Sequence, residues 1–256
     1  MDDICRKEGV AFCKCESELH QKEEALFCRW KNERKHYRFI KDGVCCPRQW
    51  EKEKVKILFV LKDANNPDKE DLRDMIMTES SSTYWKTWNN IARWTKAILE
   101  RGEYNDVRKV TKGDKTKWLS KISFINLKKA SGDKSADEKE IEEFAKDDSH
   151  FIMEQIDLYK PNIIICCGRN GSCGSNAELL YKLLREYVLP KERLSDWGKN
   201  PICGFNYFHV KLSDMASQTP VISFVHPQKR GASHEDYESW FKNLVEITEV
   251  LLPIRN

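Results

Sequence analysis

Four short, continuously apolar runs constrain the fold of this chain more than any other feature of its sequence. They are KILFVL (residues 56–61), ISFIN (122–126), NIIICC (162–167) and PVISFV (220–225). Each run is rich in β-branched or aromatic residues and too short for a helix, so each is predicted to be a strand. Continuous apolarity, rather than alternation, is typical of parallel strands that are covered on both faces.

Longer amphipathic segments lie between and after these runs. Apolar residues recur at helical spacing in residues 88–99, 140–160, 177–188 and 236–252. This alternation predicts an α/β fold, a three-layer α/β/α sandwich with a central, mainly parallel four-stranded sheet. With 256 residues, the chain is long enough for one sizeable α/β domain.

The segment before residue 54 does not follow this alternation. Residues 1–37 are polar and helix-prone, and residues 38–46 have the pattern of a hairpin that turns at Asp42-Gly43. We therefore predict two parts: a cysteine-rich N-terminal accessory segment over residues 1–53, and a main domain over residues 54–256.

Eight of the ten cysteines fall into two sets. Cys166 and Cys167 lie inside an apolar run and are predicted to be core residues. The other set crowds into the first 46 residues: Cys5, Cys13, Cys15, Cys28, Cys45 and Cys46. With nearby histidines they offer the four ligands that zinc needs, but C-x-C and C-C are not the usual zinc spacing. The favoured interpretation is that they hold no metal, with an N-terminal zinc site as the alternative.

Charge is unevenly distributed along a chain whose net charge is only +3. Ten Lys or Arg residues and four acidic residues lie from Lys86 to Lys121; Trp85 directly precedes them, and Trp88, Trp94 and Trp118 are interleaved with them. Such a segment suits a face that meets a polyanion. Oppositely charged solvated helices explain the charge pattern equally well. No apolar run approaches the ~20 residues of a membrane helix and no secretory signal is present, so we expect a cytoplasmic protein with no membrane partner.

Polar residues follow each predicted strand, at the edge where ligands bind to parallel sheets. Asp63 and Asn65 follow the first strand, Asn126 ends the second, a Gly-rich turn at 168–176 follows the third, and His226 follows the fourth. Taken singly, each has an ordinary explanation as a turn or capping residue. Together, an acid, an amide and a histidine on one edge predict a functional site.

Four segments around these residues resemble motifs of the uracil-DNA glycosylase superfamily. VLKDANN (60–66) resembles its first motif, and FINLKK (124–129) resembles the Asn-containing second strand of the iron–sulfur branch. YKPNIIICCGR (159–169) is similar to the strand that ends in Gly-Arg, and SFVHPQKRG (223–231) to the late His-Pro motif. The resemblance covers about residues 55–231, with all four motifs in the expected order.

Departures from the family pattern bear on the substrate and on the iron–sulfur cluster. Asn65 stands where the family has an aromatic residue, and Gln228 replaces the serine that follows His-Pro. The resemblance therefore implies a substrate other than plain uracil, such as a bulkier modified pyrimidine. No cysteine lies between Cys46 and Cys166, so the iron–sulfur cluster is not expected.

The resemblance implies a monofunctional DNA glycosylase, which flips a base out of DNA and cleaves its N-glycosidic bond to leave an abasic site. Asp63 would stabilise the positive charge on the sugar and orient water, and His226 would donate to the base oxygen. Asn65 is placed with them in the catalytic group. Asn126 would read the base, with Tyr84 or Trp85 stacking on it.

Other residues are expected to contact DNA. Backbone amides at the start of a helix would bind phosphate, lysines would pair with phosphates, and a loop would enter the groove. The residues concerned are Gly168, Arg169, Asn170, Gly171, Ser172, Lys128, Lys129, Gln228, Lys229 and Arg230.

Two alternatives have different functions. One is a catalytically inactive module on the same fold that only binds or senses nucleic acid. The other is an unrelated nucleotide hydrolase that uses the 168–176 turn, although this turn lacks the G-x-G-x-x-G order and a Walker lysine. Within the leading hypothesis we expect a monomer that acts on DNA, and either repair or defence against phage DNA with modified bases fits.

Overall fold

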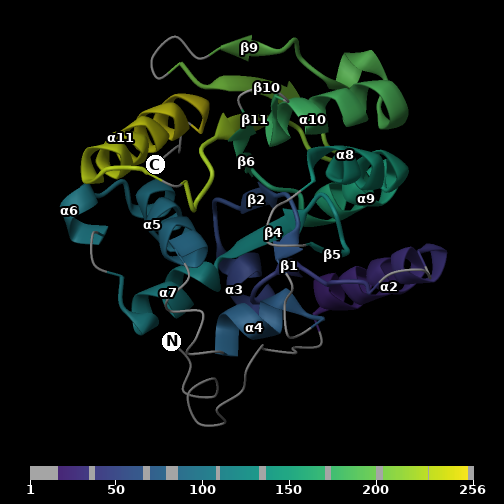
Figure 1. Cartoon of the computed structure of the whole chain (residues 1–256), viewed down its shortest axis with the longest axis horizontal. Helices are drawn as coiled ribbons and strands as arrows, with labels where there is room; N and C mark the ends of the chain where they lie inside the picture. The colour runs from purple at the N-terminus through teal and green to yellow at the C-terminus, as the bar shows by residue number, and fades with distance from the viewer. Residues whose placement is uncertain are drawn as a thin grey trace.

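The four predicted runs form neighbouring parallel strands at the centre of one sheet. They are β2 (Ile57–Leu61), β4 (Ile122–Asn126), β6 (Ile163–Cys167) and β11 (Thr219–Phe224), in the spatial order β4-β2-β6-β11. This computed structural model describes residues 17–34, 38–65, 70–78, 86–107, 110–132, 137–170, 174–199, 204–229 and 231–252. Figure 1 shows the strands at the centre of the chain.

The sheet is larger than the sequence predicts, and it is mixed. Three strands extend the parallel core through antiparallel pairs: β1 (Gly43–Val44) pairs with β4, β10 (Asn206–Val210) pairs with β11, and β9 (Gly198–Lys199) pairs with β10. The prediction of a four-stranded sheet was wrong because β1 and β9 are only two residues long. In β10 the side chains alternate between buried and partly exposed positions, which a search for continuous apolar runs does not detect.

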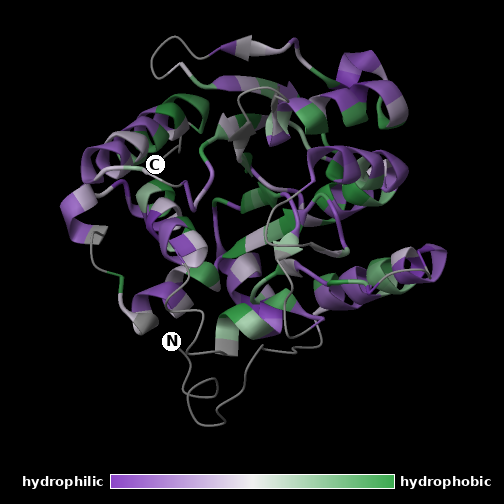
Figure 2. Cartoon of the chain, viewed as in Figure 1, coloured by the Kyte–Doolittle hydropathy of each residue, from purple (hydrophilic) through white to green (hydrophobic). Residues whose placement is uncertain are grey.

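Helices lie on both sides of the strands (Figure 1). Because side chains alternate between the two faces of a strand, β2 contributes Leu58 and Val60 to one core cluster and Ile57 and Phe59 to the other. The first cluster includes residues of α2 (Glu18–Glu33), α8 (Glu138–Asp147), α9 (Ser149–Tyr159) and α10 (Asn176–Leu183). The second includes residues of α4 (Leu72–Thr78), α5 (Lys86–Glu100), α7 (Lys112–Leu119) and α11 (His234–Leu251). In Figure 2 the hydrophobic colour concentrates on the central strands, while most helices combine both colours.

The predicted helix over residues 140–160 is two helices in the structure. α8 ends and α9 begins at Asp148, a completely buried residue whose carboxylate accepts a hydrogen bond from Arg34 Nε at 2.6 Å.

The remaining elements are short. They are α3 (Pro47–Lys52), α6 (Tyr104–Val107), a π-helical turn (Leu184–Val188), a 3₁₀ turn (Lys191–Arg193) and two small ribbons, β3–β5 (Ala64–Asn65 with Ser131–Gly132) and β7–β8 (Arg169–Asn170 with Gly174–Ser175). Within the described ranges, no helix is both long enough and apolar enough to cross a membrane.

Part of the N-terminal segment packs into the same structure as the main domain. Leu26, Phe27 and Trp30 of α2 are buried in the first core cluster, and β1 is an edge strand of the central sheet. The predicted hairpin at Asp42-Gly43 does not form, because Gly43 and Val44 pair with β4 instead. Residues 1–16 and 35–37 lie outside the described part of the chain.

A buried polar network joins α2 to the sheet. The Glu23 carboxylate is fully buried, pairs with the guanidinium of Arg73 and accepts a hydrogen bond from the Tyr159 hydroxyl at 2.5 Å. Arg73 also contacts Asp71 at 2.7 Å and Glu24 at 2.6 Å. Burial raises the pKa of the Tyr159 hydroxyl, and the neighbouring Glu23 charge raises it further, so Tyr159 stays protonated and donates its hydrogen to this carboxylate.

Gly43 has no space for a side chain beside this network. Its backbone has φ +122°, and a Cβ atom would lie 2.5 Å from the Tyr159 hydroxyl and closer still to the Glu23 carboxylate. We expect Gly43→Ala to lower the free energy of unfolding by about 2 kcal/mol, through backbone strain and the displaced network. Urea denaturation followed by circular dichroism measures this change. Gly113→Ala is the matched control, because the nearest atom to its Cβ would be 3.8 Å away; equal effects of the two variants would contradict the explanation.

Candidate functional site

The parallel registers bring the predicted strand-end residues to one edge of the sheet. Leu61 of β2 pairs with Asn126 of β4, and Phe224 of β11 pairs with Cys167 of β6. The residues that directly follow these strands continue the pairing, because Lys128 N donates to Lys62 O at 2.9 Å and Gly168 N donates to Phe224 O at 3.0 Å. Asp63, Gly168 and His226 therefore come from three neighbouring strand ends.

Asp63 is a partly buried carboxyl between groups of both charges. Burial raises its pKa; the positive charges of Lys128 and Lys62 oppose this effect, and Glu140 and Glu138 add to it. The net result is a raised pKa. A carboxyl in this position is therefore easier to protonate than an ordinary aspartate, which is a common property of acid–base residues.

The protonation state of His226 follows from one hydrogen bond and its surroundings. Its Nδ1 accepts a hydrogen bond from the backbone N–H of Gln228 at 3.0 Å. A neutral ring that accepts at Nδ1 carries its proton on Nε2. The ring reaches solvent, but the protein around it lowers its pKa and the charge of Lys62 lowers it further. At neutral pH His226 is therefore an uncharged donor through Nε2–H.

The turn that carries His226 is fixed from two sides. Lys229 N donates to His226 O at 3.0 Å, and the side-chain amide of Asn90, on α5, donates to Pro227 O at 2.6 Å. Asn90 is only 3% exposed. It was not among the predicted site residues, because a polar residue inside an amphipathic helix is ordinarily on the solvent-exposed face.

Lys62 is a second site residue that sequence reasoning missed. Its charge acts on the pKa of both Asp63 and His226. Its Cε atom would lie 3.6 Å from a Cβ at Gly168, and its ammonium pairs with Glu138 at the start of α8. Its sequence position could have indicated this role, because Lys62 directly follows a predicted strand and precedes Asp63, so it lies at the carboxyl edge of the sheet.

Asn126 lies at this edge, and the nitrogen of its side-chain amide points into the protein. It is 2% exposed, and both its backbone N–H and its Nδ2 donate to Asp42 Oδ2, at 2.7 and 3.3 Å. Base reading by Asn126 stays a prediction. Only its side-chain oxygen is left without a hydrogen-bond donor among the described residues.

The two lysines after β4 differ from the expectation. Lys129 is completely buried, with Nζ at 2.6 Å from Asp42 Oδ1, and Lys128 is 3% exposed, with Nζ at 2.6 Å from Glu140 Oε2. Both ammonium groups are therefore held by carboxylates inside the protein. Phosphate contact by Lys128 and Lys129 stays a prediction.

The Gly-rich turn also differs from the expected phosphate loop. Gly168 has φ +119° and its N–H already donates to Phe224 O, while Arg169 and Asn170 form the extended strand β7. The following helix, α10, begins only at Asn176, with Ser175 as its N-cap. The backbone amides from Gly168 to Asn170 are thus not at the start of a helix, which removes the reason for placing a phosphate there.

The remaining predicted residues divide into exposed ones and ones without a described side chain. Gln228 and Lys229 are exposed beside His226, and Lys229 Nζ lies 5.3 Å from the Trp240 ring. Tyr84, Trp85, Gly171, Ser172 and Arg230 lie outside the described residues, as do the side chains of Asn65, Arg169 and Asn170.

Three tryptophans of the basic segment, those that the structure describes, belong to the core rather than to a surface. Trp88, Trp94 and Trp118 are each at most 4% exposed, and Trp88 and Trp94 contact Phe124 and Phe224 edge-on. They are not available to stack on bases. The charge of this segment is the part of the expectation that remains.

No protein-family model matches this chain. The search of curated proteins finds no match either. The assignment to the uracil-DNA glycosylase superfamily therefore rests on the four sequence motifs and stays a prediction.

The described cysteines do not come together around a metal site. Cys45 and Cys46 are buried and Cys28 is exposed, whereas Cys5, Cys13 and Cys15 lie outside the described residues. Burial raises the pKa of the Cys45 thiol well above its usual value, and the neighbouring Cys46 raises it further, which opposes the thiolate form that zinc needs.

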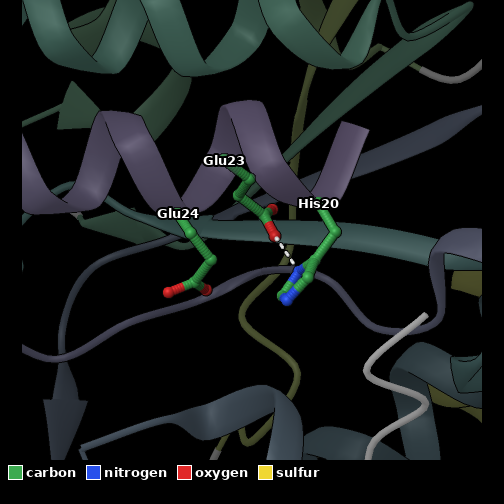
Figure 3. Close-up of side chains that lie close together, drawn as sticks. All are labelled: His20, Glu23 and Glu24. Atoms are coloured by element: carbon green, nitrogen blue, oxygen red, sulfur yellow. Dashed lines mark ion pairs between the residues drawn. The ribbon is translucent and has the colours of Figure 1, made fainter. Parts of the chain in front are cut away.

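Over the described ranges, the one group of three possible metal ligands is His20, Glu23 and Glu24. Figure 3 shows His20 and Glu23 turned toward each other, with Glu24 beside them on α2. Both carboxylates already pair with Arg73, and Glu24 also pairs with Lys41 at 2.5 Å. A cation would have to displace these partners, so the group fits an ion-pair network better than a metal centre.

Proposed function

We propose that this protein is a DNA glycosylase that hydrolyses the N-glycosidic bond of a flipped pyrimidine. The proposal rests on the sequence motifs together with one observation: Asp63 and an uncharged His226 follow the carboxyl ends of β2 and β11, with only β6 between these two strands. The proposed domain is a three-layer α/β/α sandwich, whose carboxyl edge is where ligands bind in such folds. The departures at Asn65 and Gln228 favour a modified pyrimidine as the substrate.

The proposed reaction needs two stabilising groups. As the bond between C1′ and the base nitrogen breaks, the electron pair leaves with the base and positive charge develops on the sugar. Ionised Asp63 stabilises the sugar cation and accepts a proton from the water that adds to C1′. His226, as a neutral Nε2–H donor, stabilises the negative charge on the departing base, which then takes up a proton.

A neutral histidine is better suited to this role than a charged one in one respect. It can donate a hydrogen bond to the departing base while it keeps its own proton on Nε2. Its orientation is set by the hydrogen bond from the Gln228 N–H and by the hydrogen bonds of the turn. The lowered pKa of His226 keeps the ring in this state at neutral pH.

Base release tests the proposal directly. Wild-type protein is incubated with duplexes that contain uracil, hydroxymethyluracil, hydroxymethylcytosine or glucosylated cytosine, and free base is measured by mass spectrometry. We expect release from at least one modified duplex, and a loss of about 10²- to 10³-fold in rate for His226→Ala. His150→Ala, which removes an exposed histidine of α9, serves as the matched control and should keep the wild-type rate.

If no base is released from any of these duplexes, the enzymatic proposal is overturned. If the protein then still binds one of these duplexes, the result supports the alternative of a non-catalytic DNA-binding module. Equal rates for wild type and His226→Ala on a released base would instead remove His226 from the mechanism.

A further inference from the structure

The N-terminal segment contributes a charged residue to the interior of the candidate site. Asp42 precedes β1 and is completely buried, next to the last residue of β4. Its carboxylate accepts hydrogen bonds from Asn126 N and Nδ2 and from Gln155 Nε2 at 3.0 Å, and the Lys129 ammonium donates to both of its oxygens, at 2.6 and 2.7 Å. All the acceptor positions of this carboxylate are therefore in use.

An ionised carboxylate can accept hydrogen bonds but cannot donate them. A side-chain amide next to it must therefore turn its nitrogen, and not its oxygen, toward the carboxylate. Asn126 does so, with Nδ2 at 3.3 Å from Asp42 Oδ2. The opposite rotation of the amide would bring Asn126 Oδ1 against the negative charge, so only one of the two orientations is favourable.

Lys129 is what allows this carboxylate to remain charged in the interior. A buried charge needs a partner of opposite charge and hydrogen bonds to its oxygens. The Lys129 ammonium contacts both Asp42 oxygens. The pair therefore does more than join the N-terminal segment to the sheet, since its charge decides which way the neighbouring amide faces.

We propose that Asp42 and Lys129 are positioning residues, which fix the Asn126 amide with its nitrogen inward and its oxygen free to meet the base. This inference rests on the proposed function. Keto pyrimidines such as uracil present a donor at N3 and an acceptor at position 4, whereas amino pyrimidines such as cytosine present the reverse order. An amide oxygen that faces N3 accepts a hydrogen bond from a keto pyrimidine but meets a lone pair in an amino pyrimidine, so the fixed orientation favours the keto class.

The test compares two bases that differ only in this order, hydroxymethyluracil and hydroxymethylcytosine. The variant is Asp42→Asn combined with Lys129→Met, which removes both buried charges together and lets the amide at position 126 rotate. We expect wild type to prefer one base, and the double variant to reduce the ratio of the two kcat/KM values about 10- to 100-fold. Lys121→Met is the matched control, because it removes a partly buried ion pair with Glu53 that lies outside this hydrogen-bond network; it should leave the ratio unchanged.

A second measurement reports on the amide without any activity. In ¹⁵N–¹H spectra, the side-chain NH₂ signals of Asn126, assigned by their loss in Asn126→Ala, should include one proton that is shifted downfield and exchanges slowly with solvent. In the double variant this proton should move upfield and exchange faster. Fast exchange of both protons in wild type would overturn the inference.

The possible outcomes separate this inference from the proposed function. An unchanged base ratio in a folded double variant overturns the positioning role while base release itself stands. If the wild-type protein releases no base from any duplex in the panel, the proposed function and the selection of a base are both overturned. The amide spectrum then decides whether Asp42 fixes the orientation of Asn126.

Discussion

Arg73→Met is expected to lower the free energy of unfolding by about 3 to 5 kcal/mol, the usual cost of removing one partner from a buried ion pair. Arg73 has 1% of its side chain exposed and Glu23 has none. Without the guanidinium, the Glu23 carboxylate stays in the interior with only neutral hydrogen-bond donors, such as the Tyr159 hydroxyl. The uncompensated charge, rather than the lost attraction alone, causes the large effect.

Urea denaturation of wild type, Arg73→Met and the double variant Arg73→Met/Glu23→Gln measures this contribution. Because the double variant leaves no unpaired charge that is fully buried, it should recover a substantial part of the lost stability. Lys22→Met, which removes an exposed ion pair of the same helix, should change the midpoint far less. A double variant that is as unstable as Arg73→Met would contradict the explanation by buried charge.

Asp63→Asn is expected to slow base release by about 10²- to 10⁴-fold, the range typical of a lost acid–base group. The substitution keeps the size of the side chain but removes its charge and its capacity to accept a proton. Single-turnover rates on the preferred duplex measure the chemical step. Asp147→Asn, at an exposed position of α8, is the matched control, and comparable rates for Asp63→Asn and wild type would exclude a catalytic role for Asp63.

The pH dependence of the same reaction has a defined sign. Activity requires ionised Asp63 and uncharged His226, so it should fall as pH decreases through their pKa values. The pKa of Asp63 is raised and that of His226 is lowered, and Lys62 depresses both. Lys62→Met should therefore raise both pKa values and move the acidic limb of the pH–rate profile to higher pH. A shift to lower pH would contradict the proposed electrostatic coupling.

The strands of the sheet were predictable from sequence because burial on both faces leaves a local signature. A strand such as Ile163–Cys167 must be apolar at every position, and such a run differs from an amphipathic helix without knowledge of its partners. The same reasoning put Asp63, Asn126 and His226 at strand ends. Their common edge followed from the parallel arrangement, which the registers confirm.

The additional edge strands were not predictable in this way. β1 has two residues and becomes a strand only because β4 offers unpaired backbone groups beside it. The break between α8 and α9 depends on Asp148, whose carboxylate is bonded to Arg34 from a segment more than a hundred residues away. Neither feature has a local pattern that distinguishes it from a turn or a continuous helix.

The sequence by itself determined which residues stand at the carboxyl ends of the strands, because hydrophobic pattern and chain direction are local properties. Only the tertiary structure decided what those residues can do. Lys128, Lys129 and the amide nitrogen of Asn126 look like ligand-binding groups in the sequence, but partners from distant segments, Glu140 and Asp42, bind them inside the protein. Long-range charge pairing has no periodicity, so it cannot be read from neighbouring residues. The Asp63 and His226 side chains remain open to a ligand, and their protonation likewise depends on burial and on Lys62.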